Sequence, residues 1–332
     1  MKLNNSFEIF LSRIEPTGAT QAGAISAHKT LRDRLATDPE FAAYHIETFL
    51  SGSYRRSTAV QPIKDVDIVV IINANPNKDT PRQILAFLKR VLDKYYATKT
   101  APQRRSIRID LADISMDVIP AVAPYGADRE IQIPDCTLQE WIWTNPKGHI
   151  DWTKRLNEAT KDKPSDRGRF VPLVKMAKWW KRVQLPDAKR PKGFTLECLA
   201  GWHHDPSARD WADGFIAFLE RVTMAYAAYK TRDAVPPIPD PGLPGKAIPT
   251  GLTPREFKAF LAAAEISLAL SRRARDAATA KESADLWRQV FGDRFPTSDD
   301  DEGTKATEPD ESRGPSIFTR SVHDIREAPP FA

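Results

Sequence analysis

Three aspartates occupy positions where carboxylates could bind a divalent metal ion. Asp65 and Asp67 begin the apolar run 65–72, and Asp117 lies within a second apolar run, 114–122. Side chains two residues apart leave the same face of a β-strand, so Asp65 and Asp67 would stand side by side. A cation relieves their mutual repulsion, and Mg²⁺ binds one or two protein carboxylates together with phosphate oxygens. With Asp117 as a third acid that supports a second ion, these residues predict phosphoryl or nucleotidyl transfer.

A glycine and a serine precede these acids at the end of another strand-like run. Gly52-Ser53 follows residues 44–50 and leads into the polar segment 54–58. Glycine lets backbone N–H groups approach a phosphate closely, and a serine hydroxyl can donate to it. A Gly-Ser pair alone is usually a turn, and an Asp-x-Asp on a strand is often a solvated edge. The ordered combination of both with a later embedded acid is far more specific for a triphosphate site.

The elements expected to position these groups change in kind near residue 150. Before it, apolar periodicity predicts helices over 19–36 and 79–96 and strands over 44–50, 65–72, 106–111 and 114–122. After it, helical patterns dominate, over 166–183, from Phe194, over 210–229 and over 253–287, with a proline-rich connector at 235–249. From Phe295 the chain becomes acidic and loses its periodicity, which predicts a disordered tail.

Charge is distributed unevenly along the 332 residues. The net charge is +5, but residues 297–332 carry nine acids against four bases, a charge of −5, which leaves +10 on residues 1–296. A basic body favours a polyanionic partner such as nucleotide, nucleic acid or phosphate, although a generally solvated surface would look the same. The chain has no apolar run of about 20 residues and no secretory h-region. Its two cysteines cannot form a disulfide framework, so we expect a cytoplasmic protein.

The order of these motifs resembles the polymerase-β-like nucleotidyltransferase superfamily, whose pattern is Gly-Ser, Asp-x-Asp and a distal Asp. More narrowly, the chain resembles the bacterial cGAS/DncV-like nucleotidyltransferases (CD-NTases) of anti-phage CBASS systems, most closely the clade lettered D. The narrower resemblance covers nearly the whole chain and is carried by TFLSGSYRRST at 48–58, LVKMAKWW at 173–180, PKGFTLE at 191–197 and LWRQVFGDRFP at 286–296. It implies an α+β fold, with a polymerase-β-like core of mixed sheet and helices, a C-terminal helical lobe, and a central cleft between the two lobes.

The resemblance also implies domain boundaries. Residues 1–150 would form the catalytic lobe with an N-terminal helix, residues 151–296 the helical lobe, and residues 297–332 a disordered acidic tail. In some operons, relatives have their C-terminus activated by an E1/E2-like enzyme and joined to target proteins. A small terminal residue, Ala332, on a flexible tail fits that chemistry, and loss of conjugates on deleting Phe331-Ala332 would test it.

The family's catalytic acids correspond to Asp65, Asp67 and Asp117, which would hold two Mg²⁺ ions, with Mn²⁺ able to substitute. Asp117 would assist deprotonation of the attacking ribose hydroxyl. Asp113 has the same strand parity, but Asp117 is followed by Val-Ile-Pro as in the family.

The family's nucleotide contacts correspond to Gly52, Ser53, Lys178, Lys192 and Phe194. Gly52 and Ser53 would contact the triphosphate, Lys178 would bind phosphate, and the ring of Phe194 would stack on a nucleobase. Gly193 stands where relatives often carry a serine that contacts the γ-phosphate, so Lys192 or the backbone would supply that contact. From the residues alone, Lys175, Lys178 and Arg182 form a cationic stripe that would face the carboxylates, or else a solvated helix face.

The activity that the resemblance implies is a cyclic oligonucleotide synthase. It would join NTPs, ATP among them, into a cyclic di- or trinucleotide second messenger and release pyrophosphate, in anti-phage defence. Its partners would be the NTPs and a downstream effector of the cyclic nucleotide, with no membrane and no nucleic acid required. Two alternatives stay open: an RNA-directed, poly(A)-polymerase-like nucleotidyltransferase, and a catalytically silent module that binds nucleotide or RNA.

Overall fold

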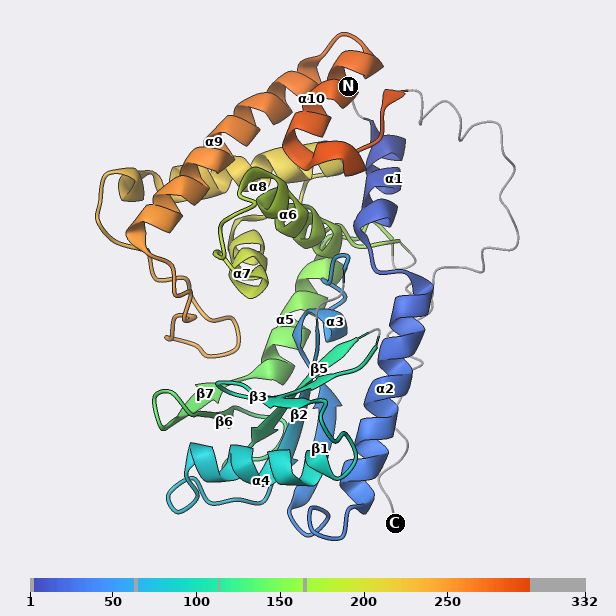
Figure 1. Ribbon diagram of the computed structural model, residues 1–332. Helices are drawn as coiled ribbons and strands as arrows, with labels where there is room; N and C mark the ends of the chain where they lie inside the picture. The colour runs from blue at the N-terminus through green and yellow to red at the C-terminus, as the bar shows by residue number, and fades with distance from the viewer. Residues whose placement is uncertain (1–2, 63–64, 113, 164–165, 299–332) are drawn as a thin grey trace.

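The computed structural model describes residues 3–62, 65–112, 114–163 and 166–298. In Figure 1 a half built on β-sheet lies below a half built of helices, and α5 (Pro146–Ala159) runs between the two. The acidic tail expected at 297–332 falls almost wholly outside the described residues, as do Ala332 and Asp113. In the part of the chain that the structure describes, no helix is both long and apolar enough to cross a membrane.

A five-stranded mixed sheet forms the centre of the first half. Its order is β1 (His45–Leu50), β2 (Asp65–Ile72), β5 (Ser115–Ala121), β4 (Ile107–Asp110) and β3 (Thr100–Pro102). β2 and β5 are parallel, whereas the other neighbouring pairs are antiparallel. The four strands expected from the sequence are confirmed, each within one residue at either end. The parallel pairing sets the start of β2 beside the start of β5.

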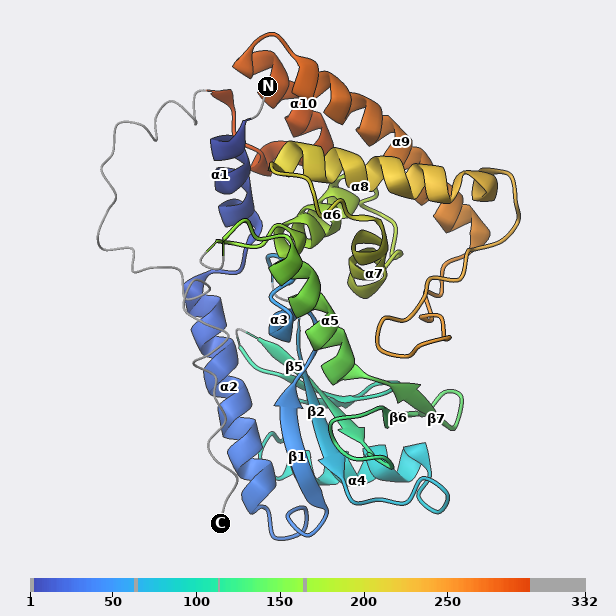
Figure 2. The same ribbon diagram turned by 180° about the vertical axis from the view of Figure 1, so that it is seen from behind.

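The side chains of β2 alternate between two apolar cores. Those on one face pack with α2 (Gly18–Thr37) and α4 (Pro81–Asp93), and they are Val66, Ile68, Val70 and Ile72. On the other face, Val69 and Ile71 pack with β5 and with β6 (Ile131–Asp135), which pairs with β7 (Glu140–Thr144). Figure 2 shows α2 running alongside β1. Asp65 and Asp67 share the parity of the second face, so they leave the sheet away from α2 and α4.

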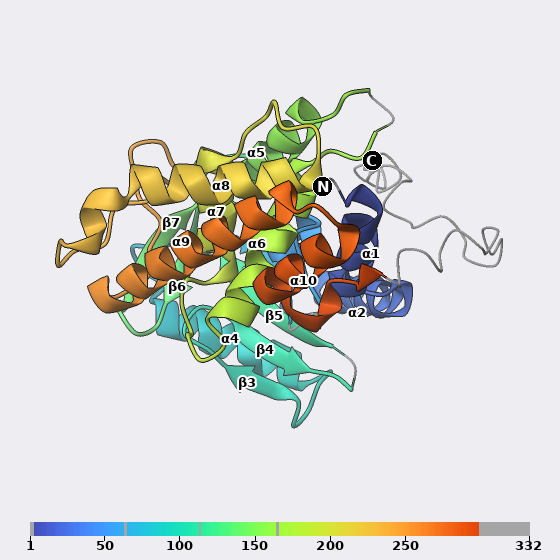
Figure 3. The same ribbon diagram turned by 90° about the horizontal axis from the view of Figure 1, so that it is seen from above.

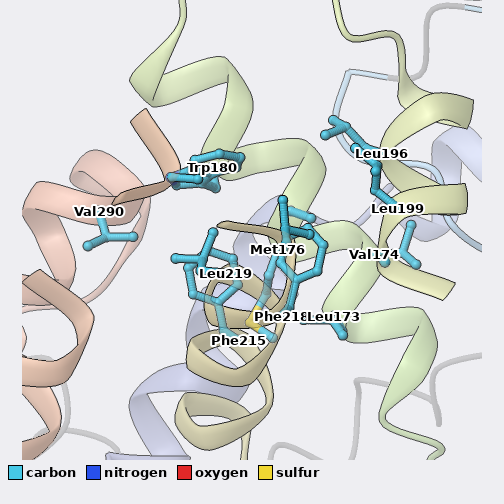
Figure 4. Close-up of a cluster of buried hydrophobic side chains, with 14 of the residues drawn as sticks. Leu173, Val174, Met176, Trp180, Leu196, Leu199, Phe215, Phe218, Leu219 and Val290 are labelled. Carbon is cyan, nitrogen blue, oxygen red and sulfur yellow. The ribbon is translucent and has the colours of Figure 1, made fainter. Parts of the chain in front are cut away.

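Helices form the second half around an aromatic core. They are α1 (Asn4–Ile14), α6 (Phe170–Gln184), α7 (Gly193–His203), α8 (Trp211–Ala225), α9 (Pro254–Asp276) and α10 (Ala280–Phe291), with 3-10 turns at Ala227–Lys230 and Gly292–Arg294. Trp180 lies in this core with Phe215 and Leu219 (Figure 4) and donates from Nε1 to Ser267 Oγ at 2.8 Å. Trp180 is therefore fully buried in the core of the helical half.

The first helix packs with the helical half although it precedes the sheet in the chain. The ring centroids of Phe7 on α1 and Trp287 on α10 lie 5.0 Å apart. Figure 3 shows the two helices side by side. Neither α1 nor α5 nor the β6–β7 hairpin was expected from the sequence.

The single long helix expected over 253–287 is wrong. The chain leaves helical geometry at residues 277–279, and Thr279 begins α10 by accepting a hydrogen bond from the N–H of Glu282. The break lets α10 fold back on α9, where Ser283 Oγ donates to the carbonyl of Ala274 at 2.7 Å. Packing of the α10 aromatics in the core therefore outweighs continuation of the helix.

Candidate active site

The parallel pairing of β2 with β5 brings the predicted acids together. In its register Asp67 is the partner of Asp117, and Asp65 is the partner of Ser115. Partners on adjacent strands project from the same face of a sheet, and so do residues two apart on one strand. Asp65, Asp67 and Asp117 therefore share one surface, although about fifty residues of chain separate the first two from the third.

Burial and mutual repulsion favour protonation of Asp67 and Asp117. Burial, followed by the charges of Asp65 and Asp117, raises the pKa of Asp67 to about 7, against smaller opposing effects from Arg56 and Lys178. Burial, and next the charge of Asp65, also raise the pKa of Asp117. Oδ1 of Asp117 is inaccessible and has no hydrogen-bond partner among the described residues. Carboxylates that repel one another and lack partners in this way are stabilised by a cation.

The oxygen ligands offered here are those that Mg²⁺ prefers, so the residues fit the metal that the sequence predicts. As the side chains stand, the described ranges contain no three Asp, Glu, His or Cys residues gathered closely enough to hold an ion. Asp65 has its Oδ2 4.0 Å from Nη1 of Arg108 on β4. A metal that used all three acids would therefore require their side chains to move closer together.

Gly52 lies directly against Asp67. Its φ is +63°, and a Cβ at this position would stand 1.7 Å from Asp67 Oδ2, so glycine is needed both for the backbone conformation and for the close approach. The turn is tied to the strand because the N–H of Ser51 donates to the backbone oxygen of Asp67 at 2.8 Å. Gly52 and Ser53 open the short helix α3 (Gly52–Arg55). The structure thus places the predicted Gly-Ser pair beside the carboxylates.

Lys178 is buried within the protein. Its ammonium donates to the backbone oxygen of Thr58 at 3.0 Å, to the hydroxyl of Thr58 at 3.1 Å and to Glu197 Oε2 at 3.2 Å. Glu197 is fully buried and also accepts from Arg56 Nε at 2.5 Å and from Thr153 Oγ1 at 3.2 Å. Because these residues come from the turn after α3 and from α5, α6 and α7, the network joins the two halves of the molecule.

The Glu197 network carries two cations on one carboxylate. Burial acts to raise the pKa of Glu197, but Arg56 and Lys178 outweigh it and lower that pKa to about 2. The surplus positive charge also acts on Asp67. Arg56 and Lys178 lower its pKa, although burial and the neighbouring acids raise that pKa by more. The sequence assigned no role to Arg56 or Glu197, and the one available signal was that they lie in the segments 48–58 and 191–197.

Phe194 and Lys192 stand at the start of α7, which begins at Gly193 with Lys192 as its exposed N-cap. The ring centroid of Phe194 lies 5.1 Å from Arg56 Cζ and 4.8 Å from the centroid of the His149 ring. A Cβ on Gly193 would stand 3.3 Å from Lys178 Cε. The structure therefore gathers Phe194, Gly193 and Lys178 around the Glu197 network.

The predicted cationic stripe is only partly consistent with the structure. Lys175 is buried and its ammonium lies 2.9 Å from Glu15 Oε1, and Arg182 donates to the backbone oxygen of Gln61. Among the stripe residues, the charge of Lys178 lowers the pKa of Asp67. Lys175 and Arg182 instead fasten α6 to the segments next to α1 and β2.

Known proteins with similar sequences and folds bear on this site. The family model described as the Second Messenger Oligonucleotide or Dinucleotide Synthetase domain matches residues 1–157. The chain is 38% identical over 307 residues to the cyclic AMP-AMP-AMP synthase of an Acinetobacter strain, covering 90% of this chain and 87% of that protein. It is 28% identical over 358 residues to the probable cyclic AMP-AMP-GMP nucleotide synthase of Salmonella paratyphi B, covering 89% and 92%.

Solved structures agree on the fold. The structure of the Bradyrhizobium diazoefficiens CD-NTase CdnG in complex with GTP is 17% identical to this chain with a TM-score of 0.73, over 87% of this chain and 95% of that one. The predicted α+β fold class is therefore confirmed.

Proposed function

Since this chain belongs to the bacterial CD-NTase family of nucleotidyltransferases, the cyclic oligonucleotide synthases, we propose that it joins NTPs, at least two of them ATP, into a cyclic trinucleotide. The relatives named cyclic AMP-AMP-AMP and cyclic AMP-AMP-GMP synthases share two adenylates in their products, which supports ATP as the main substrate. The third base and the choice between 2′–5′ and 3′–5′ linkage would be set by contacts of the nucleotides with the protein.

The observation that carries this proposal is the carboxylate surface made by the β2–β5 register, with Gly52 packed against it. In each step the ribose hydroxyl oxygen of one nucleotide would attack the α-phosphorus of another. An O–P bond forms, the bond from that phosphorus to the bridging oxygen of the β-phosphate breaks, and pyrophosphate leaves. The last step closes the ring with the same exchange of bonds.

Asp65, Asp67 and Asp117 would hold Mg²⁺, which when bound supplies positive charge to the triphosphate and the attacking oxygen. Asp117 would assist deprotonation of the attacking ribose hydroxyl, for which one of its carboxylate oxygens must come within hydrogen-bond distance of that hydroxyl.

Arg56 and Lys178 would supply positive charge to the triphosphate. Their positions are set by Glu197, so their charge is oriented before substrate binds. The exposed N-cap residue Lys192 and the backbone at Gly193 would take the part of the serine that relatives often carry. The ring of Phe194 would offer its remaining accessible surface to a nucleobase.

Incubation of the full-length protein with the four NTPs and Mg²⁺ tests the proposal. We expect a phosphatase-resistant product whose mass is that of three nucleotides closed into a ring. Asp67→Ala should abolish it, and Asp285→Ala, at an exposed aspartate of α10, should leave it unchanged. Unchanged product from the Asp65→Ala/Asp67→Ala double variant would overturn the assignment, and an extended RNA with free ends would favour the RNA-directed alternative instead.

A further inference from the structure

Arg108 extends the row of charged side chains across a third strand. In the antiparallel register of β4 with β5 it is the partner of Asp117, as Asp67 is on the other side of β5. Adjacent partners project from one face, so the order across the sheet is Asp67, Asp117, Arg108. No sequence motif points to Arg108, because its place beside the acids depends on strand pairing.

Two acids hold the guanidinium of Arg108 at the edge of this row. Nε donates to Asp110 Oδ1 at 2.8 Å, and that carboxylate is itself fixed by the hydroxyl of Ser115 at 2.6 Å. Nη1 lies 4.0 Å from Asp65 Oδ2. Both side chains are partly exposed, 29% for Arg108 and 39% for Asp65, so the pair is accessible to an incoming ion.

A guanidinium stays charged at every physiological pH and has no acceptor atom, so Arg108 cannot bind a metal and must repel one. It compensates the carboxylates when no metal is present. A free divalent cation would have to displace it from Asp65. A nucleotide that brings its own cation arrives with a net negative charge, and the same arginine attracts it.

We propose that Arg108 is the resident counter-ion of Asp65 and Asp117, and that it makes metal loading depend on the nucleotide. The inference rests on the metal site of the proposed function. Arg108 acts on the metal through the carboxylates and is a positioning residue, whereas Asp65, Asp67 and Asp117 are the ligands. Without Arg108, the acids would bind divalent ions even when no nucleotide is present.

Binding of Mn²⁺ to the full-length protein without nucleotide, followed by the electron paramagnetic resonance signal of the free ion, measures this directly. Removing one cation next to a divalent-ion site, screened nearly as in water, should tighten binding by about tenfold. We expect that gain for Arg108→Gln, and affinity like that of the parent protein for Arg108→Lys. Arg272→Gln removes an arginine from a surface ion pair with Glu220 and should change nothing. A non-hydrolysable ATP analogue should strengthen Mn²⁺ binding much more in the parent protein than in Arg108→Gln.

Equal or weaker Mn²⁺ binding by Arg108→Gln would overturn the inference. If its melting curve shows that this variant does not fold, Arg108→Met keeps the aliphatic part of the side chain without the charge and gives the same readout. Asp67→Asn separates the two proposals. If that variant still binds Mn²⁺ like the parent, the metal site itself is wrong, whereas loss of binding in Asp67→Asn together with no gain in Arg108→Gln refutes only the role of Arg108.

Discussion

Replacing Gly52 by alanine tests whether the turn after β1 sets the position of Asp67. The added methyl group would stand 1.7 Å from Asp67 Oδ2. Since the backbone of Asp67 is fixed by the N–H of Ser51, the clash must be relieved by rotation of the carboxylate or by movement of the turn.

The structure sets the size of the effect. A Cβ is essentially never found closer than 3.0 Å to such an atom, so the methyl group would displace Asp67 or the turn by about 1.3 Å, the difference between 3.0 and 1.7 Å. A misplacement of about 1 Å at a catalytic group lowers turnover by about 100-fold. The left-handed backbone at residue 52 adds a folding cost of about 1–2 kcal/mol for any residue with a Cβ.

The assay is the rate of phosphatase-resistant product at saturating ATP and Mg²⁺, together with a melting curve. Gly126→Ala is the matched control, because Gly126 also has a positive φ, +97°, but a methyl group added there would meet no described heavy atom within 4 Å. Both variants should lose stability through the backbone conformation, Gly52→Ala should lose more because of its clash with Asp67, and Gly52→Ala alone should lose turnover. If Gly52→Ala turned over within threefold of Gly126→Ala, the close approach of Gly52 to Asp67 would not matter for catalysis.

Three further outcomes follow from buried groups. Glu197→Ala leaves two buried cations without their acid and should lower the free energy of unfolding, measured in urea, by ~3–5 kcal/mol. Glu265→Ala removes one partner of an exposed ion pair and should lower it by less than ~1 kcal/mol. Equal losses would contradict a stabilising role for the Glu197 network. The pKa of Asp67 is about 7 in the folded protein against an ordinary value of 3.8, so stability without metal falls as pH rises between these values. Asp67→Asn should therefore raise the melting temperature of the metal-free protein by several degrees at pH 8 and by progressively less toward pH 4, and a gain that does not depend on pH would refute the shift. Ser267→Ala removes the acceptor of the buried Trp180 Nε1 and should cost ~1–3 kcal/mol by calorimetry, a loss that would be absent if the indole found another partner.

The sequence predicts that Asp65 and Asp67 share one face because strand parity is a local property. Side chains two residues apart in a strand lie on one face whatever the rest of the fold does. An acid embedded in an apolar strand is also costly to bury without a partner. The pairing of Asp67 with Asp117 depends on the register between two distant strands, which the local sequence does not reveal. The position of Arg108 on the next strand depends on strand pairing in the same way. The Glu197 network is still less visible, since Arg56 and Glu197 are 141 positions apart in the chain.

The errors in secondary structure have physical causes of the same kind. Residues 277–279 are Ala-Ala-Thr, which do not break a helix by propensity, and it is the packing of α10 that ends α9. The sequence did carry one signal for a new helix at this point, the N-cap residue Thr279 followed three residues later by Glu282. The β6–β7 hairpin was missed because its turn, 136–139, contains neither glycine nor proline, and Gln139 itself takes the positive φ of 57°.

The parallel pairing of β2 with β5 also decides which changes in chain length the protein can tolerate. One residue inserted in β2 before Asp67, or in β5 before Asp117, would turn the later side chains of that strand to the opposite face, so that the acid would exchange places with an apolar neighbour. An insertion in the connections around α4 would leave the pairing intact. Lineages that diverge from this chain should therefore vary in length between the two strands and not within them.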